Sequence, residues 1–164
     1  MGIFSKLFPQ KETANPDAIY APMAGRAVPI GEVEDPTFAE GMLGQGVAIL
    51  PSDGRVYAPC DAVVGTMFDT GHAISLTADN GAEILIHVGL ETVALKGRCF
   101  QVHVKSGQRI RRGQLLFEAD LAGIRAAGLD TITPILICNA EDYPALTMHT
   151  GESVTNRDAI MLLR

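Results

Sequence analysis

The sequence lacks tryptophan and any long apolar run, and it has few cysteines. No run approaches the roughly 18 apolar residues of a membrane-spanning helix, so the sequence excludes such a span. Cys60, Cys99 and Cys138 lie far apart in the sequence. The apolar stretch at the N-terminus is too short for the hydrophobic region and cleavage site of a secretory leader. An odd number of cysteines without a leader is typical of a reducing compartment. We therefore expect a cytoplasmic protein.

Positive charge is also scarce, because 13 Lys and Arg face 19 Asp and Glu, for a net charge of −6. Binding to nucleic acid needs a basic surface that releases counterions, so we expect no nucleic-acid partner. Anionic membrane surfaces are disfavoured for the same reason. The acidic charge would suit a basic protein partner, although mild acidity is also common in proteins without one.

Glycine and proline, in contrast, are frequent, with 17 and 9 residues among 164. They separate short apolar runs that begin at Ile19 and recur along most of the chain. This spacing predicts an all-β fold, a compact antiparallel sandwich or barrel with at most one or two short helices. The clearest runs cover residues 46–50, 55–59, 62–68, 73–77, 83–89 and 114–119.

Three local features refine this prediction. Asp120 predicts the start of one helix and Gly128 its end. Pro134 has no N–H group to donate to a neighbouring strand, so we expect its apolar run to form an edge strand or a bulged one. Segments 19–28 and 56–65 resemble each other, which indicates either a duplicated β unit or chance reuse of a strand, a proline and a turn.

We divide the chain into a flexible N-terminal tail, residues 1–16, and one domain, residues 17–164. Within the tail, apolar residues recur at helical spacing before Pro9. This pattern fits either a frayed terminus or a short amphipathic segment. Such a segment would make at most a weak, peripheral contact with a membrane or a partner, because it is only two apolar turns long.

The pair Asn80-Gly81 is a strong signal for a two-residue turn between two strands. A two-residue loop places His87 opposite Ile74 and His72 opposite Gly89. The two histidines then share one face, with their backbones about 7–8 Å apart along a diagonal. A three-residue loop would shift the pairing by one residue and put them on opposite faces, unless a bulge restored the register.

Two close imidazoles permit three interpretations: an incidental surface pair, a metal site and a phosphoryl-transfer site. The metal site lacks a third ligand at suitable spacing, since Cys99 and His103 lie on a different segment. For phosphoryl transfer, a neutral imidazole is both a good nucleophile and a good leaving group. The second imidazole can hydrogen-bond the phosphoryl oxygens. Thr70 is placed to orient His72, and Gly89 would leave an open surface over both rings.

Residues 81–97, GAEILIHVGLETVALKG, resemble the signature of the glucose-type IIA domain of the bacterial phosphoenolpyruvate-dependent sugar phosphotransferase system. Every element of that signature is present, with Glu91 where aspartate is more common. Further resemblance extends over most of residues 17–164. It is carried by segments 35–49, 65–76, 106–121 and 133–139.

The resemblance implies a β-sandwich of the duplicated hybrid motif type. It implies that His87 carries a phosphoryl group, on Nε2, and that His72 hydrogen-bonds it. The donor would be the histidine-containing phosphocarrier protein, and the acceptor a cysteine in the IIB domain of a sugar permease. Regulated metabolic enzymes or permeases are further expected partners. No resident cofactor is implied, although His72, His87 and a partner's carboxylate could hold a transient zinc ion.

The resemblance also implies an apolar docking rim around the histidines, with acidic side chains beside it. Its expected members are Phe38, Phe68, Leu85 and Val93, flanked by Asp35 and Glu91. As a rim residue, Phe38 is expected to have an exposed ring that contributes little to stability. Burial as an ordinary packing residue is the alternative for Phe38 and for Phe68. Ile74, Leu85 and Val88 stand where relatives can have phenylalanine, so partner preference can differ.

Two other protein classes share parts of this pattern. A biotinyl or lipoyl carrier needs a lysine at a hairpin tip, where this chain has Asp79-Asn80-Gly81. A zinc peptidase of related β architecture needs H-x3-D and H-x-H motifs, and neither occurs. A regulatory binding protein that is never phosphorylated would keep the same surface, so that alternative stays open.

Overall fold

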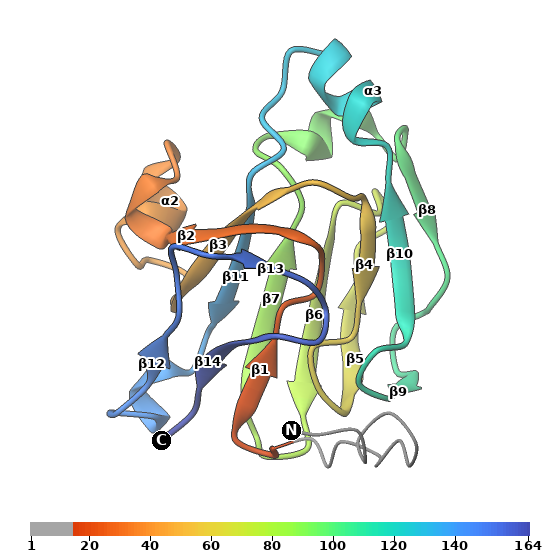
Figure 1. Ribbon diagram of the computed structural model, residues 1–164. Helices are drawn as coiled ribbons and strands as arrows, with labels where there is room; N and C mark the ends of the chain where they lie inside the picture. Colours follow the sequence, from red (N-terminus) through yellow and green to blue (C-terminus); the bar gives the residue numbers. More distant parts are fainter. Residues whose placement is uncertain (1–14) are drawn as a thin grey trace, which may run out of the picture.

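The computed structural model describes residues 15–164, which form a fold made almost entirely of short β-strands (Figure 1). The tail predicted for residues 1–16 therefore lies almost wholly outside the described residues. The strands are β1 (Ala18–Tyr20), β2 (Gly25–Pro29), β3 (Gln45–Pro51), β4 (Arg55–Tyr57), β5 (Ala62–Met67), β6 (Ala73–Ala78), β7 (Glu83–His87), β8 (Phe100–Val102), β9 (Arg109–Ile110), β10 (Leu115–Ala119), β11 (Thr133–Ile137), β12 (Thr147–Met148), β13 (Ser153–Val154) and β14 (Ala159–Leu162). The all-β prediction is confirmed.

The described strands pair antiparallel in three sheets. The largest has the order β13-β2-β3-β11-β7-β6-β5-β9, and the two smaller ones are β1-β14-β12 and β4-β10-β8. Figure 1 shows β1 and β14 in front of the middle strands of the large sheet. Fully buried side chains from both layers, among them Ile74, Ile86, Phe117 and Ile160, share one apolar core. Burial of this core is the main stabilising contribution to the sandwich.

The similarity between segments 19–28 and 56–65 reflects a duplicated unit. The two segments form β1–β2 and β4–β5, and they exchange equivalent hydrogen bonds: Tyr20 N donates to Pro59 O (3.0 Å), and Tyr57 N donates to Pro22 O (2.6 Å). The first strand of each unit also pairs antiparallel with a strand from outside the unit: β1 pairs with β14, and β4 pairs with β10. The second strands of the two units are related in the same way, because β2 pairs with the edge strand β13 and β5 pairs with the edge strand β9.

The two α-helices are short, and no helix within residues 15–164 is long and apolar enough to cross a membrane. Helix α3 (Leu121–Ala126) begins where predicted, with the Asp120 carboxylate accepting a hydrogen bond from Gly123 N. Gly128 follows it in a left-handed conformation, with φ of 80°. Helix α2 (Pro36–Ala39) was not predicted, although Asp35 before a proline is a recognisable start signal.

Three single 3-10 turns complete the structure: η1 (Ile30–Glu32), η2 (Thr92–Leu95) and η3 (Ala140–Asp142). The prediction for Pro134 is wrong, because β11 is a central strand between β3 and β7. Pro134 is tolerated there because the pairing of β11 with β7 starts one residue later, at Ile135 opposite Ile86. Its missing N–H therefore falls at the end of that ladder.

Candidate functional site

The hairpin of β6 and β7 has a different register from the one predicted. Its loop is three residues long, because Ala78 N donates to Ala82 O, and His87 lies opposite Ala73. Ile74 pairs with Ile86, and both are fully buried in the core on the face away from His87. Asn80-Gly81 therefore forms part of a longer loop than a two-residue turn.

The two histidine rings nevertheless meet, as predicted. Their centroids are 4.9 Å apart, and the ring planes are nearly perpendicular at 80°. Strand alternation does not apply to His72, because it lies in a bend before β6 and follows Gly71, whose φ is 71°. That bend turns the His72 side chain toward His87, while the His72 carbonyl still accepts a hydrogen bond from Val88 N at 2.8 Å.

The His87 ring is held by a backbone carbonyl. Its Nδ1 lies 2.8 Å from Gly89 O, and a carbonyl oxygen can only accept, so Nδ1 carries the proton. In the neutral ring, Nε2 then has a free lone pair. Gly89 does not provide the open surface that we expected. It is buried with φ of 78°, and a Cβ there would lie 2.6 Å from Thr92 Cγ2 and 2.7 Å from Asp130 O.

Thr70 contacts His72 as the sequence analysis predicted. Its Oγ1 is 2.6 Å from His72 Nδ1, and the His72 side chain is only 4% exposed. The hydroxyl fixes the plane of the ring in the bend between β5 and β6. If the hydroxyl donates to Nδ1, the Nε2 of His72 carries a proton and becomes a hydrogen-bond donor.

Burial keeps both imidazoles neutral. The pKa of His72 falls from 6.5 to about 4, because burial disfavours the charged ring and His87 adds repulsion. Burial also lowers the pKa of His87, against the opposing effects of the Gly89 carbonyl and the Asp35 carboxylate. At neutral pH the site therefore offers an unprotonated nucleophile beside an uncharged hydrogen-bonding ring.

Two phenylalanines extend the pair into a row of four rings. Phe38 lies 5.0 Å from His87, and Phe68 lies 5.6 Å from His72, between ring centroids. The expectation that Phe38 is exposed is wrong. Its side chain is 5% exposed and packs with Val28, Val33 and Leu136, because α2 folds back over β3 and β11.

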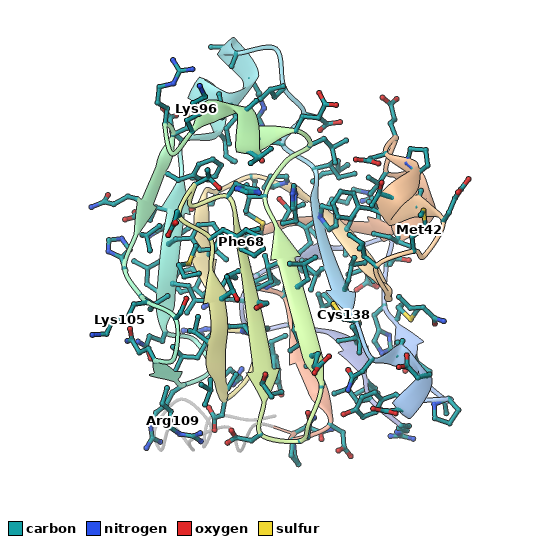
Figure 2. All side chains as sticks on the ribbon, turned by 180° about the vertical axis from the view of Figure 1, so that it is seen from behind. Met42, Phe68, Lys96, Lys105, Arg109 and Cys138 are labelled. Atoms are coloured by element: carbon teal, nitrogen blue, oxygen red, sulfur yellow. The ribbon has the colours of Figure 1, made fainter. Side chains whose placement is uncertain are left out.

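The other members of the expected rim differ in exposure. Phe68 is 38% exposed and Val93 is 53% exposed, whereas Leu85 is partly buried against the Phe38 cluster. Figure 2 shows Phe68 on the outer face of the large sheet, near the upper ends of its middle strands. Phe68 and Val93 are therefore the exposed apolar members of the expected rim, and the Phe68 ring contacts His72.

Acidic side chains gather at the Phe38 side of the site. Asp35 and Glu91 line a cavity of about 380 Å³ together with Glu34, Leu90 and Asp130. Asp35 and Glu91 were expected at the site, whereas Glu34 and Asp130 were not. Nothing local marks Asp130 as a site residue, because its loop reaches the histidines only through the pairing of β11 with β7.

Among residues 15–164 there is no group of three or more potential ligands that could hold a metal ion. His72 and His87 supply two imidazoles, which is fewer than the four ligands of a structural zinc site. A zinc ion shared with a partner's carboxylate stays a prediction.

Comparison with known proteins finds relatives over most of this chain. The model of the family described as phosphoenolpyruvate-dependent sugar phosphotransferase system, EIIA 1, matches residues 17–143. A glucose-specific EIIA component of Bacillus cereus is 44% identical over 153 residues, which are 93% of each chain. A beta-glucoside-specific EIIBCA component of Dickeya chrysanthemi is 50% identical over 127 residues, 77% of this chain but only 20% of that longer protein.

A solved structure, glucose permease IIA from Mycoplasma capricolum, has the same fold. It superposes with a TM-score of 0.84 and 33% identity, covering 90% of this chain and 95% of that one. The matched family region includes the bend at His72, the end of β7 at His87 and helix α2. The chain therefore belongs to the EIIA 1 family of the phosphoenolpyruvate-dependent sugar phosphotransferase system.

Proposed function

We propose that this EIIA component accepts a phosphoryl group on His87 Nε2 from the histidine-containing phosphocarrier protein and passes it to a cysteine of a IIB domain. The observation that carries the proposal is the bond from His87 Nδ1 to Gly89 O, which leaves Nε2 as the nucleophile. The Dickeya relative supports a IIB acceptor, because its name combines EIIB, EIIC and EIIA parts in one protein.

The site suits both directions of transfer. The Nε2 lone pair attacks phosphorus, and the bond between phosphorus and the donor's imidazole nitrogen breaks, returning its electron pair to the donor. The His87 ring gains positive charge as the new bond forms, and the Gly89 carbonyl stabilises that charge through Nδ1–H. In the second step a cysteine thiolate forms an S–P bond, and the N–P electron pair returns to His87.

His72 acts on the phosphoryl group, by hydrogen-bonding its oxygens, rather than on the His87 nucleophile. Thr70 orients its ring, and its neutral state avoids placing a second full positive charge beside His87. From a centroid distance of 4.9 Å, a protonated Nε2 can reach the oxygens of a group on His87. His72 therefore steadies the transferring group, which matters most in handing it on.

Both partners would dock over the exposed Phe68 and Val93 side chains, with Asp35 and Glu91 meeting basic groups. A relay must release each partner quickly, so we expect a small contact of less than about 1,200 Å². An apolar centre keeps water away while phosphorus moves between nucleophiles. Binding of regulated enzymes or permeases at this surface stays a prediction.

The test is incubation of the chain with phosphoenolpyruvate and the general phosphocarrier proteins, followed by mass spectrometry. His87→Gln should abolish uptake, because an amide is not a nucleophile. His72→Gln should still take up the group but transfer it poorly to a IIB domain. His103→Gln is the matched control, since His103 pairs with Glu118 on another sheet. Equal and complete loss of uptake in both site variants would contradict these roles.

A further inference from the structure

The turn after His87 is held by a threonine that has no part in the mechanism above. Thr92 is fully buried, and its hydroxyl donates to Val88 O at 2.5 Å, closing the turn across four residues. Its methyl group occupies the space that a side chain at position 89 would need. One small side chain therefore both closes the turn and packs against Gly89.

Gly89 needs such restraints, because glycine has more backbone freedom than any other residue. Both peptide groups that flank it are hydrogen-bonded at each polar atom. In the first, Val88 O accepts from Thr92 and Gly89 N donates to Ile132 O at 3.1 Å. In the second, Gly89 O accepts from His87 and Leu90 N donates to Asp130 O at 3.0 Å.

The other partners in this arrangement come from a separate segment. The loop before β11 supplies the two accepting carbonyls, and the Asp130 carboxylate fixes that loop by accepting from Ile132 N at 2.9 Å. Within the turn itself, Glu91 is also left-handed, with φ of 57°, a conformation unfavourable for a residue with a side chain. The hydrogen bond from the Thr92 hydroxyl to Val88 O spans Glu91 and closes the turn around it.

We propose that Thr92 is a positioning residue: by fixing the Val88 carbonyl, its hydroxyl restrains the adjoining Gly89, which holds the Gly89 carbonyl against His87 Nδ1 and so keeps the Nε2 lone pair free. The proposal rests on the proposed function only in assigning Nε2 as the nucleophile. Without the hydroxyl, the peptide between Val88 and Gly89 can rotate. Gly89 then shifts, and its carbonyl can move away from the His87 ring. The His87 proton is then no longer confined to Nδ1.

Two substitutions separate the hydroxyl from the methyl group. Thr92→Val keeps the shape but removes the donor, whereas Thr92→Ser keeps the donor and removes the methyl group. Thr133→Val is the matched control, because Thr133 is equally buried but donates to Thr131 O on β11's side of the site. That control loses a comparable buried hydrogen bond without touching the carbonyl that binds His87.

The first readout is the tautomer of His87, from ¹⁵N chemical shifts of its ring nitrogens at neutral pH. We expect the Nδ1–H form in the wild type, in Thr92→Ser and in Thr133→Val, and a mixture of both forms in Thr92→Val. A wild-type ring with its proton on Nε2 would overturn the proposal even if Thr92→Val failed to fold. So would a folded Thr92→Val with unchanged shifts.

The second readout is uptake of a phosphoryl group from phosphoramidate, which needs no protein donor. His87 Nε2 forms the new N–P bond, and ammonia leaves with the electron pair of the broken one. Thr92→Val should react about 10-fold to 100-fold more slowly, as expected for a misplaced reacting group, and Thr92→Ser at close to the wild-type rate. Equal slowing in Thr92→Ser and Thr92→Val would also overturn the role of the hydroxyl.

The tautomer readout and labelling by the phosphocarrier proteins together separate this inference from the proposed function. If the phosphocarrier proteins fail to label the wild type while the tautomer responds to Thr92→Val as described, the positioning role stands and the proposed function fails. If labelling succeeds and the tautomer does not respond to Thr92→Val, the proposed function stands and the positioning role of Thr92 fails.

Discussion

At the scale of single residues, burial makes His72 sensitive to pH. Its pKa is about 4 in the folded protein against 6.5 ordinarily, so between these values the unfolded chain binds a proton that the folded one does not. Stability therefore rises with pH in this window: the contribution of neutral His72 is present above pH 6.5 and is lost as the pH falls toward 4.

His72→Gln should accordingly flatten the pH dependence of the unfolding free energy. The largest expected difference in slope is about 1.4 kcal/mol per pH unit between pH 6.5 and 4, because one proton is involved. Urea unfolding of both proteins at pH 7, 6 and 5 measures it. Parallel curves for wild type and variant would show that His72 does not carry this dependence.

Phe38 gives a second prediction at this scale. Because its ring is buried against Val28, Val33 and Leu136, Phe38→Ala should lower the unfolding free energy by about 3–5 kcal/mol. Phe68→Ala is the comparison. Because Phe68 is 38% exposed, this substitution should lower the unfolding free energy by clearly less. Urea unfolding at neutral pH distinguishes them, and similar losses in both would mean that Phe38 is not a packing residue.

At the scale of elements, α2 brings both a ring and a charge to His87. The Asp35 carboxylate caps the helix by accepting from Thr37 N, and it raises the pKa of His87. Asp35→Asn keeps a capping oxygen but loses the charge, so it should lower the His87 pKa with little loss of stability. Asp35→Ala should lower the same pKa and also cost about 1 kcal/mol.

Titration of the His87 ring by NMR, with thermal unfolding alongside, separates the two roles of Asp35. An unchanged His87 pKa in Asp35→Asn would show that this carboxylate does not act on the ring. A marked loss of stability in the same variant would show that an amide oxygen cannot replace the carboxylate at the cap.

The elements also show what the sequence could and could not predict. Helix α3 was found because a capping aspartate and a glycine mark its ends. The hairpin is predictable, but its register is not, because Asn80-Gly81 favours a two-residue turn, whereas a glycine such as Gly81, with φ of 93°, can also end a three-residue loop. Helix α2 is too short for a periodic pattern, and the burial of Phe38 depends on strands far away in the sequence.

At the scale of the whole molecule, the site is assembled from segments that no local pattern connects. Helix α2, the bend at His72, the end of β7 and the loop before β11 meet only because of the order of strands in the large sheet. The resemblance in the signature could place the two histidines together. The hydrogen bonds from the turn after His87 to Ile132 O and Asp130 O could not be predicted without the topology, because they join segments that meet only through paired strands.

The first and last strands of the domain lie side by side, since β1 pairs with β14 and Leu163 N donates to Asp17 O. Both lie near the tip of the histidine hairpin, where Asn80 Nδ2 donates to Pro16 O, whereas the histidines occupy its open end. A tether joined at either end of residues 15–164 would thus start away from the site. A short flexible tether raises the effective concentration of a partner domain to about millimolar values, so weak docking suffices when both domains share one polypeptide.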